Sequence, residues 1–208
     1  MSWSVQPASP DVPPEALAAH LWNTDQKLNS FMFGRMEVLL DVLRCEWAQD
    51  RGLLCHKQSF TVMNGDKVLG LLTGHTAAEY GPNFEAAKTL QMGRLSPKDE
   101  RHMVRSLYWM DRLFPVPCAG SYYVLELSTA PEARGMGIAK ELIAAAKKRA
   151  VEQGCSRICL DVAADNDAVG FYRHLGFDVE IETRVPFLEE AYSIGVHLHM
   201  VWDLGVSS

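Results

Sequence analysis

Long hydrophobic runs are missing from this sequence. The longest uninterrupted apolar runs hold about five residues, whereas a membrane-spanning helix needs roughly 18 to 20. The first residues, MSWSVQPASPDVPPE, also lack the basic stretch and the apolar stretch of a secretory signal. We therefore expect no membrane association and a cytoplasmic location.

An excess of positive charge is missing as well. The chain has 20 Lys and Arg against 26 Asp and Glu, so its formal net charge is −6. Without a basic field, nucleic acid is not an expected partner. A small phosphorylated ligand remains compatible with this charge, because a few oriented N–H groups and one Arg are enough to hold it.

Paired cysteines are absent too. The five cysteines are odd in number and form no CxxC pair, which favours buried thiols over disulfides or a metal site. They are Cys45, Cys55, Cys118, Cys155 and Cys159. We assign no metal to this sequence.

What remains is an ordinary globular composition, with 48% apolar and 22% charged residues among 208. No linker, internal repeat or low-complexity stretch divides the chain, so we predict one domain over residues 1–208. The pattern predicts an α/β fold with one mixed sheet covered by helices.

The expected elements follow hydrophobic spacing and turn residues. The N-terminal part predicts a short strand at 4–8, a helix carrying Leu17 and Leu21, one further helix over 31–48, and a hairpin turning at Asn64-Gly65. Two helices are expected within 76–117. The rest predicts strands at 122–129, 157–162, 177–183 and 197–202, with helices at 137–153 and 168–175.

A glycine-rich turn, Arg134-Gly135-Met136-Gly137-Ile138-Ala139, lies between a predicted strand and the start of a predicted helix. Unpaired N–H groups and the positive end of the helix dipole meet at such a turn, so it favours an anion. The glycines allow close approach of the backbone, and Arg134 adds charge-assisted hydrogen bonds. A plain tight turn is the alternative interpretation.

Two segments together resemble the GNAT family, the Gcn5-related N-acetyltransferases. Arg134, Gly137 and Ala139 match its R/Q-x-x-G-x-G/A motif for acyl-CoA binding, and Phe171–Phe177 is similar to its F/L-Y-x-x-x-G-F segment. The resemblance covers about residues 122–183, the expected CoA-binding core, and the helical stretch 76–117 would be an insertion before the central strand.

The resemblance implies a splayed sheet in which the strand ending near Thr129 parts from the next strand to admit the pantetheine arm of acetyl-CoA. Backbone groups of Leu127 to Thr129, with Ser128 between them, would hold that arm, and residues Arg134 to Ala139 would receive the pyrophosphate. The family has an Asn seven residues before its Tyr; here Asp165 stands there and Asn166 follows, and either side chain could cap the helix and touch the cofactor.

In the family, the Tyr corresponding to Tyr172 lies near the CoA sulfur, where a phenol can protonate the leaving thiolate. A packed core Tyr on an amphipathic helix is the alternative interpretation. The attacking amine must also lose a proton, because an alkylamine has a pKa near about 10.4. Glu126 is the candidate base, but strict alternation points it away from Tyr123, Leu125, Leu127 and Thr129, so only a bulge would make it available.

Other candidates for the acceptor site are weaker. His75, Glu79 and Tyr80 follow the hairpin and are expected to be ordinary loop residues, although they could reach the site. His197 and His199 share one face of the last strand, but without an evident carboxylate or thiol partner they make a weak metal site. The insertion 76–117 and the loop 185–195 are possible walls of the acceptor pocket.

The sequence therefore predicts an acetyl-CoA-dependent N-acetyltransferase that acts on a primary amine by direct transfer, with acetyl-CoA as co-substrate and no metal. The alternative is a catalytically silent CoA-binding sensor of the same fold, favoured by the doubtful orientation of Glu126. A change of acyl donor also stays open. The acceptor is not specified by the sequence, and exposed final strands make a homodimer plausible.

Overall fold

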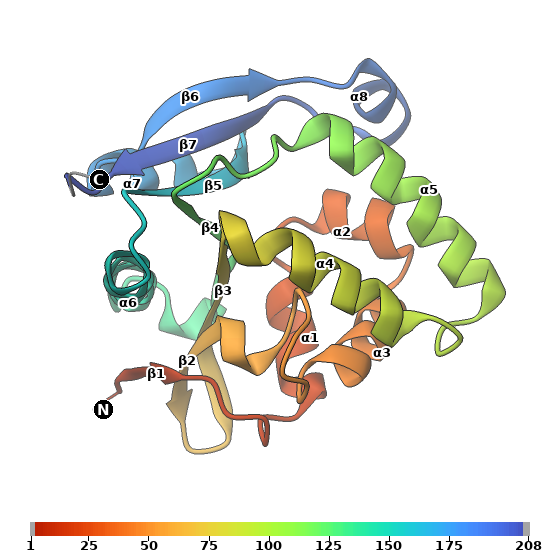
Figure 1. Cartoon of the computed structure of the whole chain (residues 1–208), viewed down its shortest axis with the longest axis horizontal. Coiled ribbons are helices and arrows are strands. Elements are labelled where there is room, and N and C mark those ends of the chain that lie inside the picture. The colour runs from red at the N-terminus through yellow and green to blue at the C-terminus, as the bar shows by residue number, and fades with distance from the viewer. Residues whose placement is uncertain (1–2, 206–208) are drawn as a thin grey trace.

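The computed structural model describes residues 3–205, and its centre is a seven-stranded sheet (Figure 1). The strand order is β1-β2-β3-β4-β5-β7-β6, in which β4 and β5 are parallel and every other neighbouring pair is antiparallel. The mixed sheet predicted from the sequence is confirmed. The strands are β1 Val5–Pro7, β2 Ser59–Asn64, β3 Lys67–Thr76, β4 Ser121–Thr129, β5 Arg157–Ala163, β6 Asp178–Thr183 and β7 His197–Asp203.

Helices cover both faces of the sheet. On one face α6 (Ile138–Glu152) and α7 (Ala168–Leu175) bury their apolar sides against β2 to β5. The other face is covered by the N-terminal helices and by the pair that precedes β4 (Figure 1). These are α1 Pro14–Trp22, α2 Gln26–Phe33, α3 Met36–Glu46, α4 Ala77–Gln91 and α5 Pro97–Leu113, with α8 Pro186–Tyr192 packed near α5.

The predicted helix over 31–48 is confirmed only for Met36–Glu46 (α3), because residues 31–33 belong to the separate helix α2. Asp25 caps α2 by accepting a hydrogen bond from the Leu28 N–H, and α2 ends at Gly34, whose φ of +75° lies in the left-handed region. Glycine adopts that conformation without a Cβ clash. Helix α3 then begins at Met36, while α2 packs against α5 through the buried Phe31.

The hairpin is confirmed, but its turn lies one residue later than predicted. Asn64 pairs with Lys67, so the two loop residues are Gly65 and Asp66, and Gly65 supplies the positive φ of +59°. The predicted loop 185–195 contains the short helix α8, which packs on α2 and α5.

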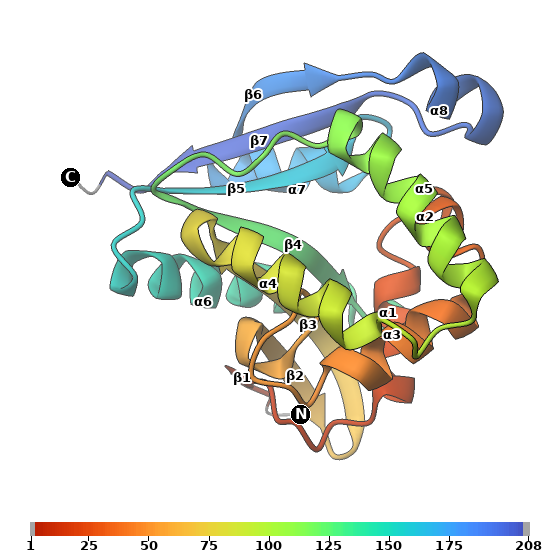
Figure 2. The ribbon, with the colours of Figure 1, turned by 45° about the vertical axis from the view of Figure 1, so that its right-hand side comes forward.

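Strands β4 and β5 separate along their length, and this separation creates the site. They pair only from Ser121–Val124 to Arg157–Leu160, and beyond Leu160 no ladder joins them. Figure 2 shows the two strands diverging from their shared end. The splay implied by the sequence resemblance is present.

Candidate functional site

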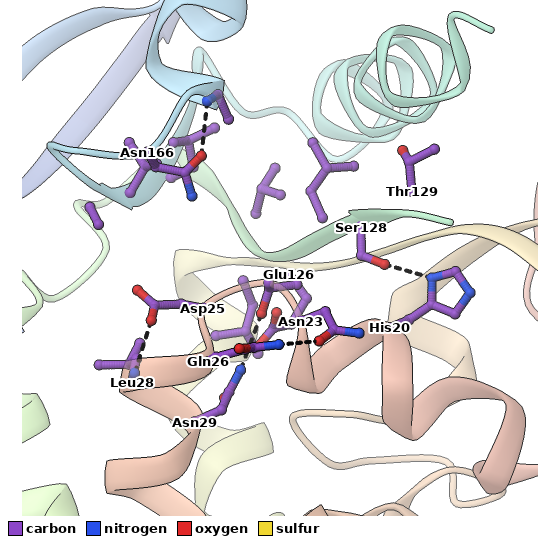
Figure 3. A pocket seen from close by; sticks show the side chains of 18 of the residues that line it. His20, Asn23, Asp25, Gln26, Leu28, Asn29, Glu126, Ser128, Thr129 and Asn166 are labelled. Carbon is purple, nitrogen blue, oxygen red and sulfur yellow. Dashed lines mark hydrogen bonds between the residues drawn. The ribbon is translucent and has the colours of Figure 1, made fainter. Parts of the chain in front are cut away.

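A groove with a volume of about 1420 Å³ runs through the opening between β4 and β5. Residues from α1, the α1–α2 loop, β4, β5 and α7 line it, and Figure 3 shows many of them from close by. Of the residues predicted to act in the site, the groove brings together Glu126, Leu127, Ser128, Thr129, Arg134, Asn166 and Tyr172.

A β-bulge in β4 determines where Glu126 points. Thr73 of β3 pairs with Glu126, and the next residue, Gly74, pairs with Val124, so Leu125 has no partner in the ladder. One extra residue reverses the alternation of side chains beyond it. The expectation from strict alternation is therefore wrong for Tyr123 and Leu125, although Glu126 still points opposite to Leu127, and the bulge that was needed to make Glu126 available is present.

Glu126 lies beside the α1–α2 loop in the groove (Figure 3). Burial raises the pKa of its carboxyl; with a hydrogen bond from Thr24 that lowers the pKa and the Asp25 carboxylate that raises it, the net pKa is about 8. A carboxyl with a pKa close to neutral can exchange a proton near physiological pH. This is the chemistry expected of a general base.

Tyr172 lies on α7 on the other side of the splay, and it is buried. Burial raises the pKa of its phenol to about 12, and the charge of Glu126 contributes in the same direction. The phenol is therefore protonated at neutral pH. One groove thus contains a carboxyl that can accept a proton and a phenol that can donate one.

The pantetheine-binding stretch predicted on β4 has one edge free. Leu127 pairs with Leu72 and Thr129 with Gly70, so β3 occupies the opposite edge of β4, and the edge toward β5 lines the groove. Ser128 points to α1, where its hydroxyl lies 2.7 Å from Nδ1 of His20 (Figure 3). A free strand edge can pair with an extended amide chain.

The glycine-rich turn lies at the N-terminus of α6. Gly135 and Gly137 have φ values of +77° and +80°, and nothing approaches within 4 Å of where a Cβ would stand on either. The N–H groups of the first helical turn have no intrahelical partner. Arg134 and Met136 are exposed there, while Ile138 is buried and anchors the helix to the sheet.

The Asn expected near the Tyr acts as a cap in the structure. Asn166 lines the groove, and its Oδ1 accepts a hydrogen bond of 2.9 Å from the Ala168 N–H at the start of α7. Asp165 instead lies 3.6 Å from the Lys27 ammonium on the surface. The structure therefore gives the capping position to Asn166.

A polar loop between α1 and α2 faces Glu126, and the sequence analysis missed it. Asn23, Thr24, Asp25 and Asn29 line the groove there. Burial opposes ionisation of Asp25, but the nearby His197 imidazole and a hydrogen bond from the Leu28 N–H lower its pKa below the usual value. The signal that could have revealed this loop is the N-cap residue Asp25 before a helical stretch.

The two histidines of β7 do have carboxylate partners, so that expectation was wrong. His199 Nδ1 lies 3.0 Å from Asp161 Oδ1, and both side chains are 3% exposed. His197 Nε2 lies 3.8 Å from Asp25 Oδ2. Among the described residues, no group of three His, Cys, Asp or Glu side chains is arranged to hold a metal ion.

The candidates that follow the hairpin divide into two kinds. His75 is buried and bonds to the Leu53 carbonyl and to Asn83, and burial lowers its pKa to about 4. Glu79 completes a capping box with Thr76 at the start of α4. Both are therefore structural, whereas Tyr80 lines the groove.

Comparison with known proteins agrees with this geometry. The model of the Acetyltransferase (GNAT) family matches residues 20–177. A crystal structure described as an acetyltransferase superposes with a TM-score of 0.68 at 17% identity, covering 96% of this chain and 98% of that one. An N-acetyltransferase from Staphylococcus aureus Mu50 gives 0.68 at 14% identity, covering 95% and 98%.

A mycothiol acetyltransferase from Paenarthrobacter aurescens (strain TC1) is 42% identical over 64 residues, which are 30% of this chain and 19% of the relative. The match thus spans about a fifth of that longer protein. Since the family match extends over most of the chain, this protein belongs to the GNAT acetyltransferase family. The prediction of an acyltransferase is confirmed at the level of the family. Among residues 3–205, no helix has both the length and the apolarity needed to cross a bilayer.

Proposed function

We propose that the protein transfers the acetyl group of acetyl-CoA to a primary amine by direct attack. The observation that carries the proposal is the bulge at Leu125, because it turns Glu126 into the groove that Tyr172 also lines. The doubtful orientation of Glu126 was the reason to consider a silent CoA-binding sensor. With that carboxyl in the groove, turnover is the better interpretation.

In the proposed reaction, the free edge of Leu127–Thr129 pairs with the pantetheine amides, and the turn Arg134–Ala139 holds the pyrophosphate. Oriented N–H groups, the helix dipole and the Arg134 guanidinium all favour an anion at that turn. Asn166 fixes the start of α7 and thereby the position of Tyr172. Acetyl-CoA binding thus uses mostly backbone groups.

The chemical step forms one bond and breaks another. The amine nitrogen loses a proton to the Glu126 carboxylate and attacks the thioester carbonyl, which forms the C–N bond. Collapse of the tetrahedral intermediate breaks the C–S bond, and the Tyr172 phenol donates its proton to the leaving thiolate. The products are an N-acetylated amine and free CoA.

Thermal unfolding with and without acetyl-CoA is the first test. A ligand present at 100 times its Kd stabilises the folded state by about 2.7 kcal/mol, a clear shift in Tm. We expect this shift for the wild-type protein and its loss in Arg134→Ala, followed by amine-dependent thiol release. Binding without turnover on any amine would support the sensor instead, and a folded, cofactor-free protein that shows no shift would contradict both.

A further inference from the structure

The inner end of the groove, near the vertex of the splay, differs from the cofactor motifs in its chemistry. It is lined by Tyr123 of β4, Asp161 of β5, His197 of β7, Tyr80 of α4 and Phe114, the residue after α5. We call these five residues the inner subsite. Four of them lie in different helices and strands and Phe114 directly follows α5, and none belongs to the acyl-CoA motif.

Aromatic rings form the sides of the inner subsite. Tyr80 and Tyr123 meet edge to face with centroids 5.6 Å apart, and Phe114 and His197 do the same at 5.4 Å. Tyr80 and Phe114 are contributed by the two helices that precede β4. These helices therefore supply walls of the groove in addition to packing on the sheet.

Asp161 supplies the charge of the inner subsite. It follows Leu160, the last residue of β5 that pairs with β4, and its Oδ1 lies 3.0 Å from Nδ1 of His199. Its side chain is 3% exposed, and within residues 3–205 no well-aligned hydrogen bond satisfies the buried Oδ2, although the Tyr123 hydroxyl lies near the carboxylate. Burial, followed by the nearby Asp161 carboxylate, holds the pKa of Tyr123 well above its usual value.

A second buried polar atom without a hydrogen bond lies in the inner subsite. Nε2 of His197 also lacks a hydrogen-bond partner within the described residues, because Asp25 Oδ2 lies 3.8 Å away, while its Nδ1 lies 3.1 Å from the Gly195 carbonyl. Buried polar atoms are nearly always satisfied, so two unsatisfied atoms beside one cavity indicate a group that is bound there. The basic side chains that line the groove, Lys67 and Arg134, flank the outer end of β4, beyond Thr129.

Aromatic faces around a carboxylate oxygen without a partner are the chemistry that recognises an organic cation. We propose that the inner subsite binds a second cationic group of the acceptor, so that the protein acetylates one end of an α,ω-diamine. This inference rests on the proposed function. One amine reacts beside Glu126, while the ammonium at the other end hydrogen-bonds to Oδ2 of Asp161.

The spacing suits short diamines. Asp161 lies beside Tyr123, and Tyr123 precedes Glu126 by three residues, which is about 10 Å on a fully extended strand and less across a bulge. The test therefore compares putrescine and cadaverine with n-butylamine and n-pentylamine, which have the same chain lengths and only one amine. Acetyl-CoA-dependent thiol release gives kcat and KM for each amine.

We expect the wild-type kcat/KM to be about tenfold or more higher for each diamine than for its matched monoamine, the effect of one charged hydrogen bond. Asp161→Asn should bring the two substrates to near equality, mainly through the KM of the diamine, and leave the KM for acetyl-CoA unchanged. Asp178→Asn makes the same chemical change on the exposed start of β6, and it should leave the diamine preference and the KM for acetyl-CoA unchanged. Equal use of both amines by the wild type, or a preference that survives in Asp161→Asn, would overturn the proposal.

Tyr80→Leu provides a second variant if Asp161→Asn does not fold. It removes an aromatic face and keeps the Asp161 to His199 contact, so the ratio of diamine to monoamine kcat/KM should fall about threefold or more. If no amine is acetylated, the proposed function fails, and calorimetry of cadaverine binding to the CoA-saturated protein then tests the subsite alone. Binding that Asp161→Asn abolishes would support it, and absence of binding by the wild type would overturn it.

Discussion

One wall of the groove, made by β4 and the turn before α6, presents mainly backbone groups, whereas the facing wall presents side chains. The first wall consists of a free strand edge and the N-terminus of a helix, with glycines that expose the chain. The second wall consists of carboxylates, amides and aromatic rings from the α1–α2 loop, α4 and β7. The backbone wall can bind the same ligand in many sequences, while the side-chain wall can change with each substitution.

Glu126 lies on β4, in the backbone wall, but it acts through its side chain. Because it is the proposed base, its replacement has the largest expected effect. Glu126→Gln should lower kcat about 10²- to 10⁴-fold, because the amine loses its proton acceptor. Glu182→Gln, the same change on exposed β6, is the control. Steady-state thiol release measures both, and near-normal kcat in Glu126→Gln would contradict the role of base.

The same carboxyl predicts the pH dependence. The base must be ionised to act, so wild-type kcat/KM should rise with pH through about 8, the pKa of Glu126. Because that pKa is raised in the folded state, the folded protein favours the protonated carboxyl, and the associated stability is lost as pH rises from the usual Glu value to about 8. Above pH 8, Glu126→Gln should therefore have a free energy of unfolding about 1 to 2 kcal/mol higher than the wild type, a difference kept small because Glu126 is partly open to the groove.

Tyr172→Phe is the next largest change, and it removes only one hydroxyl. We expect kcat to fall about 100-fold, while the Kd of acetyl-CoA and the Tm stay near the wild-type values. Since the pKa of Tyr172 is about 12, loss of its proton should not limit the wild-type rate below that pH. If the wild-type activity decreases at a pH well below 12, and Tyr172→Phe shows the same decrease, then another group donates the proton.

A pair of glycine variants tests the backbone wall. Gly137→Ala and Gly154→Ala both place an alanine at a positive φ, +80° and +74°, with no atom within 4 Å of the new Cβ. Each should destabilise the fold by about 1 kcal/mol. Gly137 lies at the start of α6 and Gly154 just beyond its end, so only Gly137→Ala should also raise the KM for acetyl-CoA, by about tenfold. Equal KM values for the two variants would contradict the assignment of the turn.

Asp25→Asn has the smallest expected effect and tests the coupling between the two walls. Asn caps a helix as well as Asp does, so the free energy of unfolding should change by less than about 0.5 kcal/mol. The negative charge of Asp25 raises the pKa of Glu126, and its removal should move the rising limb of the pH profile toward lower pH. Asp25→Ala, which also loses the cap, should cost about 1 kcal/mol. An unchanged pH limb in Asp25→Asn would show that the two carboxyls are not coupled.

The same division explains what the sequence could predict. The turn Arg134–Ala139 and the segment Phe171–Phe177 are local, so their spacing alone indicates the backbone wall and the GNAT fold. The orientation of Glu126 depends on a bulge formed against Gly74, where a Cβ would come within 2.6 Å of the Tyr122 ring. No local pattern shows that contact.

The contacts of the side-chain wall could not be predicted from the sequence for related reasons. Asp161 meets His199 only because β5 and β7 pair in antiparallel register, with those two residues opposite each other. Asp25 was overlooked because the break at Gly34 was not recognised, so helix α2 was not expected. Long-range register and one unrecognised helix boundary therefore account for most of what the sequence left open.

The contact between His20 and Ser128 fixes the direction of a hydroxyl dipole in the groove. Nε2 of His20 lies 2.9 Å from the Val68 carbonyl, which can only accept, so Nε2 carries the proton. Burial lowers the pKa of His20, and the neutral ring must then accept at Nδ1 the hydrogen bond that Ser128 donates. Ser128 consequently offers the groove only oxygen lone pairs, and any ligand atom that meets it there must be a donor.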